Sequence, residues 1–173
     1  KVCQGLFGYI SYDAVQFFET VRLKDKQVNG NRIPLMRYRL YQYVIAIDHF
    51  KEELYLIENK IGGLPSEISV VESLIRSRDV PVFPFRALAS ERSNMTDEDY
   101  RSMVKNGIAG CFRGDVFQIV LSRRFEQSFN GDEFNVYRAL RSINPSPYLF
   151  YFDYGEYKLF GSSPESQLIV QNG

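Results

Sequence analysis

One polar amide, Gln118, lies inside a run that is otherwise built to be buried, "GDVFQIVLSRRF" at Gly114 to Phe125. A neutral amide can hold a small reactant in place by hydrogen bonding, without acting as a base. In a strand, the same side chain can instead hydrogen-bond to a neighbouring loop. The residues alone leave both roles open, and the spacing by itself favours the structural one.

A second candidate is the carboxyl group of Glu165 in "GSSPES", Gly161 to Ser166, where Pro164 stiffens the backbone before it. A glutamate can act as a general acid, and partial burial would raise its pKa so that it carries a proton near neutral pH. The structural alternatives are a cap on the next element or an ion pair with Arg123 or Arg124.

A third candidate is the segment "NPSPYL" at Asn144 to Leu149. Its two prolines stiffen a strand edge and leave backbone carbonyls unpaired. The simpler interpretation is a helix end followed by a strand. No phosphate-binding glycine loop or Cys/His cluster accompanies these segments, and a single histidine, His49, supports no catalytic triad.

Composition excludes several classes of partner. The 173 residues are 45% hydrophobic and 24% charged, with Lys plus Arg equal to Asp plus Glu at 21 each. A zero net charge supplies no broad attraction to nucleic acid or to an anionic membrane. No apolar run reaches the roughly 18 residues of a membrane span. We therefore expect a soluble, cytoplasmic protein with neither nucleic acid nor membrane as a partner.

The elements that must position these candidates alternate between strands and amphipathic helices. Apolar spacing and turn residues predict a hairpin over 39–59, helices over 65–78, 96–110 and 132–144, and strands over 115–125, 148–154, 157–163 and 166–170. Thr96 is the expected cap of the second helix and Asp132 that of the third. This order predicts an α+β fold of largely antiparallel sheets with packed helices. Residues 79–94 read as a connector, so we expect two parts, 1–94 and 95–173.

Four segments in this order, "GLFGYISYDAVQFFE", "GDVFQIVLSRRF", "NPSPYLFYF" and "FGSSPES", resemble the anthranilate synthase component I family of chorismate-utilising enzymes. The resemblance covers essentially the whole chain and implies the chorismate-utilising fold. The forms "NPSPY" and "QIVLS" favour this family over the related aminodeoxychorismate and isochorismate synthases. The resemblance implies conversion of chorismate and ammonia to anthranilate and pyruvate in tryptophan biosynthesis. It also implies a glutamine amidotransferase partner subunit, magnesium as cofactor and feedback inhibition by tryptophan.

The resemblance also implies a role for each candidate. Glu165 would protonate the C4 hydroxyl of chorismate as it leaves. Gln118 would position ammonia, because water-adding relatives carry a lysine base there and ammonia, with its own lone pair, needs no base. The predicted tryptophan-binding residues are Asn144, Pro145, Ser146, Pro147, Tyr148 and Leu149. The alternatives are an aminodeoxychorismate synthase component I and a non-catalytic amino-acid-binding module.

Several segments that the resemblance implies have no match in these residues. The magnesium-binding glutamates, a catalytic histidine and a "PIAGT"-like segment would follow Gly173, and an "LLES"-like segment would precede Lys1. We therefore expect a middle piece of the subunit, inactive alone and without metal ligands of its own. Residues 1–94 would lie on the regulatory side, and residues 95–173 would begin a truncated chorismate-binding catalytic region.

Overall fold

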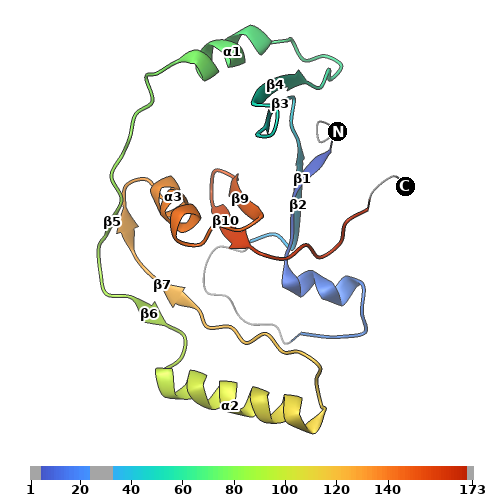
Figure 1. Cartoon of the computed structure of the whole chain (residues 1–173), viewed down its shortest axis with the longest axis vertical. Coiled ribbons are helices and arrows are strands. Elements are labelled where there is room, and N and C mark those ends of the chain that lie inside the picture. The colour runs from blue at the N-terminus through green and yellow to red at the C-terminus, as the bar shows by residue number, and fades with distance from the viewer. Residues whose placement is uncertain (1–4, 24–32, 171–173) are drawn as a thin grey trace. The chain divides into compact units, whose positions relative to one another are not determined.

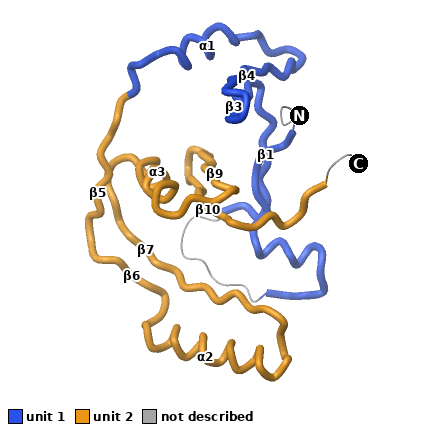
Figure 2. Tube along the Cα trace, viewed as in Figure 1, with its two compact units in different colours: residues 1–80 blue, residues 81–173 orange. Residues whose placement is uncertain are grey.

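The computed structural model describes residues 5–23 and 33–170. The chain forms two compact units, Lys1–Val80 and Pro81–Gly173 (Figure 2). Within the described residues, the strands form five two-stranded antiparallel sheets, accompanied by helices in both units (Figure 1). The predicted α+β class with antiparallel sheets is therefore confirmed. The division into 1–94 and 95–173 stays a prediction.

The first unit contains two strand pairs, a 3-10 helix and one α-helix. Strands β1 (Leu6–Ile10) and β2 (Met36–Leu40) pair with each other, and η1 (Tyr12–Phe17) follows β1. Strands β3 (Tyr43–Asp48) and β4 (Glu53–Glu58) form the predicted hairpin. Helix α1 (Ile68–Arg76) lies inside the predicted range 65–78. The apolar patterns of this unit thus predicted the hairpin and α1, whereas the pairing of β1 with β2 and the 3-10 helix were not predicted.

The second unit opens with two short strand pairs that the sequence did not predict. Strand β5 (Arg86–Ala87) pairs with β8 (Phe129–Asn130), and β6 (Arg92–Ser93) pairs with β7 (Phe125–Glu126). Residues 86–93 are therefore more than a connector. Two-residue strands carry no readable alternation, and their partners lie more than thirty positions away in the chain.

Helix α2 (Asp97–Arg113) begins as predicted at Thr96. The Thr96 hydroxyl accepts a hydrogen bond from the Asp99 amide at 3.1 Å, and the Asp99 carboxylate accepts one from the Thr96 amide at 3.3 Å. This reciprocal pair is a capping box. The helix ends at Gly114, whose φ of 79° lies in the left-handed region that favours glycine.

Helix α3 (Phe134–Ile143) and the hairpin of β9 (Tyr148–Asp153) and β10 (Lys158–Ser163) complete the unit, as predicted. The Asp132 carboxylate accepts a hydrogen bond from the Phe134 amide at 2.9 Å, which serves the first turn of α3. The strand predicted over 166–170 is wrong, because these residues pair with no other described backbone segment.

Aromatic side chains hold α3 against one face of the β9–β10 hairpin. Phe134 meets Tyr151 edge-on, with ring centroids 4.9 Å apart, and Tyr151 stacks on Phe160 at 5.7 Å. Tyr137 contacts both Tyr151 and Phe160, at 5.4 and 6.2 Å. This cluster links the helix that precedes the "NPSPYL" segment to the strand that precedes Glu165.

Few apolar side chains are fully enclosed. Among the described residues, the buried hydrophobic side chains are Ala14 and Tyr154, whereas Phe112 and Phe117 are almost completely exposed. No helix in the described ranges is both long and apolar enough to cross a membrane.

Candidate functional site

The end of the β9–β10 hairpin brings two of the three candidate segments together. In the antiparallel ladder, Tyr148 lies opposite Ser163 and Leu149 lies opposite Ser162. The "NPSPYL" segment therefore enters β9 where "GSSPES" leaves β10, as the hairpin in Figure 1 shows. Antiparallel pairing explains this arrangement, because the start of one strand meets the end of the other.

Serine hydroxyls join the two segments at this end. Ser162 Oγ lies 2.5 Å from the Asn144 carbonyl oxygen and 2.8 Å from Ser146 Oγ. Ser163 Oγ donates to the Glu165 carbonyl oxygen at 3.3 Å. The Asn144 carbonyl is thus already paired, whereas the sequence predicted unpaired carbonyls along this segment.

The predicted tryptophan-binding residues do not present one continuous surface. Tyr148 and Leu149 are consecutive residues of β9, so their side chains point to opposite faces of the hairpin. Leu149 shares its face with Tyr151, the face on which α3 packs, while Tyr148 is 43% exposed on the other face. Side chains of both residues therefore cannot line the same face, and tryptophan binding by residues 144–149 stays a prediction.

Glu165 lies after the end of β10 and is exposed. The partial burial expected for this side chain is therefore not provided by the described residues. Both arginines named as alternative partners are paired elsewhere: Arg123 Nη1 lies 2.6 Å from Asp97 Oδ1, and Arg124 Nη2 lies 2.9 Å from Glu126 Oε1. The proposed ion pair between Glu165 and either arginine is therefore wrong.

Gln118 lies between α2 and β7, in a stretch that is not a strand. The predicted strand over 115–125 is wrong for residues 115–124, which pair with no described strand. A strand needs a partner backbone, and apolar content alone does not supply one. Gln118 is exposed, and its neighbours Phe117 and Val120 are 102% and 83% exposed. No hydrogen bond or ion pair within the described residues joins Gln118 to Glu165.

Two contacts secure the far end of this stretch against the end of β6 and the residue after it. Arg123 Nε donates to Ser93 Oγ at 2.7 Å, and the Arg124 amide donates to Asn94 Oδ1 at 2.9 Å. The hydrogen bond from Arg123 lowers the pKa of Asp97 below its ordinary value, and the charge of Arg123 acts in the same direction. Residues 114–124 are therefore anchored at both ends, by α2 before them and by these contacts after them.

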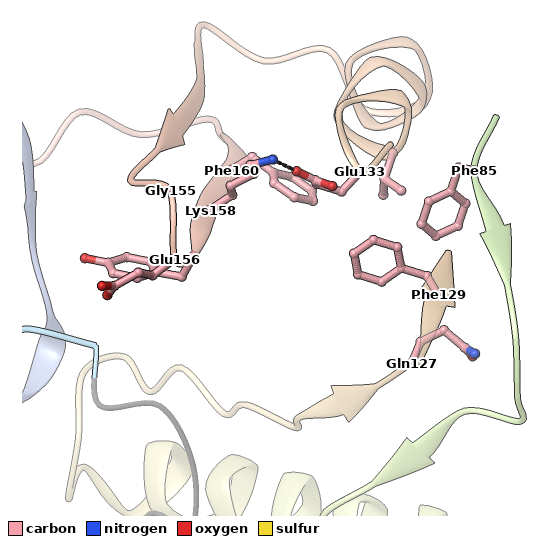
Figure 3. A pocket seen from close by; sticks show the side chains of 10 residues that line it. Phe85, Gln127, Phe129, Glu133, Gly155, Glu156, Lys158 and Phe160 are labelled. Carbon is pink, nitrogen blue, oxygen red and sulfur yellow. Dashed lines mark hydrogen bonds and ion pairs between the residues drawn. The ribbon is translucent and has the colours of Figure 1, made fainter. Parts of the chain in front are cut away.

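The sequence did not reveal a cavity of about 470 Å³ beside α3. Its apolar wall includes Phe85, Phe129 and Phe160, and Lys158 and Glu133 form an ion pair at its edge. In Figure 3, Phe85 and Phe129 lie on one side of the cavity and Glu156 lies on the other. These residues come from separate elements, so no local motif could have predicted the cavity.

The ion pair at this cavity shifts the pKa of both of its members. The hydrogen bond from Lys158 lowers the pKa of Glu133, and the same bond raises the pKa of Lys158. Burial is the main cause that raises the pKa of Tyr151, whose hydroxyl lies 3.4 Å from Glu133 Oε1. At neutral pH the lysine and the glutamate are both charged, and the pair fixes the start of α3 to β10.

Comparison with known proteins identifies the family. Residues 1–173 match the family described as chorismate binding enzyme. The chain belongs to this family. It is 33% identical over 186 residues to anthranilate synthase component 1 of Aquifex aeolicus, an alignment that covers 98% of this chain and 36% of that protein. It is 34% identical over 193 residues to anthranilate synthase alpha subunit 2, chloroplastic, of Arabidopsis thaliana, covering 98% and 31%.

A solved structure supports the same assignment of family and fold. The crystal structure of anthranilate synthase component I from Streptococcus pneumoniae TIGR4 superposes with a TM-score of 0.75 at 29% identity. It covers 98% of this chain and 40% of that one. The predicted chorismate-utilising fold is therefore confirmed, and the chain spans about a third of the length of the curated relatives named above.

The described part of the chain contains no group of three or more His, Cys, Asp or Glu side chains suited to a metal ion. Carboxylate oxygens are the ligands that magnesium prefers, and they would have to converge. These residues do not fit a magnesium site by themselves. The location of the magnesium ligands elsewhere in a longer protein stays a prediction.

Proposed function

We propose that this chain forms part of the large subunit of an anthranilate synthase. The observation that carries the proposal is the match to the chorismate-binding family along all 173 residues, together with relatives named anthranilate synthase at 33% and 34% identity. The complete subunit would convert chorismate and ammonia to anthranilate, pyruvate and water. A glutamine amidotransferase subunit would supply the ammonia, and the cytoplasm is the expected location.

In this reaction, ammonia forms a bond to C2 of chorismate while the bond between C4 and its hydroxyl oxygen breaks. Hydroxide is a poor leaving group, so the carboxyl group of Glu165 donates the proton with which it departs as water. Elimination of pyruvate then leaves the aromatic ring of anthranilate. Magnesium, held by residues outside those described, would supply electrostatic stabilisation of the substrate's negative charge.

Gln118 has a positioning role in this proposal. Its amide can accept a hydrogen bond from ammonia and hold it near C2 without competing for its lone pair. Support comes from residue type and from the anchoring of residues 114–124 at both ends. Because Gln118 and Glu165 are both exposed here, the role requires that other parts of a longer subunit enclose them.

Tryptophan acts as the feedback inhibitor in this proposal, bound at residues 144–149. The side chain of Leu149 and the backbone of Asn144 lie at the same end of the hairpin, next to Ser162. An amino acid bound there would lie next to Ser162, which precedes Glu165 by three positions in the chain. This proximity supports a regulatory role for the segment.

The test uses the full-length subunit that contains these residues, incubated with chorismate, ammonia and magnesium. Anthranilate is detected by its fluorescence, and pyruvate is measured in parallel by a coupled enzymatic assay. Equal amounts of both products are expected. Formation of aminodeoxychorismate without pyruvate would overturn the proposal in favour of the related synthase. Tryptophan binding without any turnover of chorismate would favour a binding module instead.

A further inference from the structure

Ser162 has two hydrogen-bond partners. The roles proposed for Glu165 and Gln118 do not involve it. Its hydroxyl oxygen lies 2.5 Å from the Asn144 carbonyl oxygen and 2.8 Å from Ser146 Oγ. A hydroxyl carries one proton, so Ser162 donates to the carbonyl of Asn144 and accepts from the hydroxyl of Ser146. The end of β10 is thus connected to the loop between α3 and β9 by side-chain bonds in addition to the strand ladder.

The next residue continues the connection toward Glu165. Ser163 points to the opposite face of the hairpin from Ser162, as successive strand residues do. Its hydroxyl donates to the Glu165 carbonyl oxygen at 3.3 Å. Displacement of Ser162 therefore shifts the backbone of Ser163 and, through this bond and one intervening proline, the backbone of Glu165.

The acceptor of the first bond is a group that an amino-acid ligand would use. An ammonium group held by backbone carbonyls of this segment needs oxygens such as that of Asn144, where Ser162 already donates. A carbonyl oxygen has two lone pairs, so the ligand either shares this oxygen or replaces the serine. In both cases the position of the loop and the position of Ser162 depend on each other.

We propose that Ser162 is a positioning residue that couples ligand occupation of residues 144–149 to the placement of Glu165. This inference rests on the proposed function, because it presumes that tryptophan binds this segment and that Glu165 acts in the reaction. The inference adds one residue, Ser162, through which tryptophan binding at residues 144–149 changes the activity of Glu165. Coupling between two sites is a free energy that both ligands share, and it can be removed without removing either site.

Ser162→Ala tests the coupling in the full-length subunit. Two quantities are measured: the dissociation constant of tryptophan by calorimetry without chorismate, and the residual rate of anthranilate formation under saturating tryptophan. We expect the dissociation constant to change by less than about twofold, and the residual fractional rate to rise about fivefold or more, the lower end of typical couplings. Ser162→Thr keeps the hydroxyl and should restore inhibition.

Ser142→Ala is the matched control, because its hydroxyl also lies near a backbone carbonyl oxygen, that of Arg138 at 3.2 Å, but within α3. It should leave both quantities at the wild-type level. If Ser162→Ala fails to fold, Ser162→Cys replaces the hydroxyl by a weaker donor at the same position and should also raise the residual rate.

Three outcomes would overturn the inference. The first is unchanged inhibition of Ser162→Ala by tryptophan. The second is a loss of tryptophan binding that accounts for the loss of inhibition, which would make Ser162 part of the binding site. The third is failure of Ser162→Thr to restore inhibition. A wild-type subunit that makes anthranilate but neither binds tryptophan nor is inhibited by it would instead overturn the proposed regulation, before any variant is compared.

Discussion

Replacement of Thr96 by alanine tests whether the capping box of α2 is a real source of stability. The Thr96 hydroxyl accepts from the Asp99 amide at 3.1 Å and lies 2.7 Å from Asp99 Oδ2. Alanine removes this acceptor and leaves an amide of the first turn without a side-chain partner. Loss of such a cap costs about 1 kcal/mol. In a chain of this size, that corresponds to a fall in melting temperature of roughly 2–4 °C.

The assay is urea unfolding of the 173-residue chain, followed by the helical signal in circular dichroism. Thr96→Ser retains the hydroxyl and should stay close to wild type. Ser142→Ala removes a hydroxyl that lies 3.2 Å from the Arg138 carbonyl oxygen within α3, where no cap is lost. A change below about 0.5 kcal/mol in Thr96→Ala, the scatter of ordinary surface substitutions, would refute the reasoning. Equal losses in the serine and alanine variants would refute it as well.

Acid should weaken the same cap. The hydrogen bond from the Thr96 side chain lowers the pKa of Asp99 below its ordinary value of 3.8. A group whose pKa is lowered on folding adds stability above its unfolded pKa and loses it as the pH falls through the folded pKa. The difference between wild type and Thr96→Ala should therefore shrink in strong acid. Because Asp97, next to Thr96, pairs with Arg123, fraying at Thr96 would also loosen the anchor of the Gln118 stretch.

Three further predictions concern activity. In the full-length subunit, Glu165→Gln should lower turnover by about 10²–10⁴-fold with little change in chorismate binding, because a general acid acts chiefly in the transition state. A rate within about threefold of wild type in the anthranilate fluorescence assay would return Glu165 to a structural role. Gln118→Lys should abolish ammonia-dependent anthranilate formation, resolved by chromatography, since it places a positive charge where ammonia must be held. Unchanged formation would mean that Gln118 faces away from C2. The 173-residue chain alone should form no anthranilate from chorismate, ammonia and magnesium, and fluorescence above the uncatalysed background would contradict this.

Local patterns in the sequence determined most of the helices and the longer hairpins. The hydroxyl of Thr96 and the acidic turn after it predicted the start of α2, and Pro145 predicted that α3 would end before it. Alternating apolar residues predicted the β9–β10 hairpin around Gly155. These signals succeed because caps, turns and periodicity act over a few residues of the chain.

The order of short motifs also carried the family resemblance, which the match over residues 1–173 confirms. This resemblance implied a proton donor at Glu165 and an amide that positions ammonia at Gln118. Their exposure was not predictable, because burial depends on which other segments cover a side chain. Apolar content likewise predicted strands over 115–124 and 166–170 that have no partner among the described residues.

Only the tertiary structure decided which distant residues meet. It paired β5 with β8, joined Lys158 to Glu133, and placed the Ser162 hydroxyl against the loop at Asn144. Each of these contacts joins residues at least 18 positions apart, across turns whose path depends on the packing of α3 against β9 and β10. The sequence determines these contacts only through the folded chain as a whole. No local pattern next to either partner indicates which distant residue it will contact.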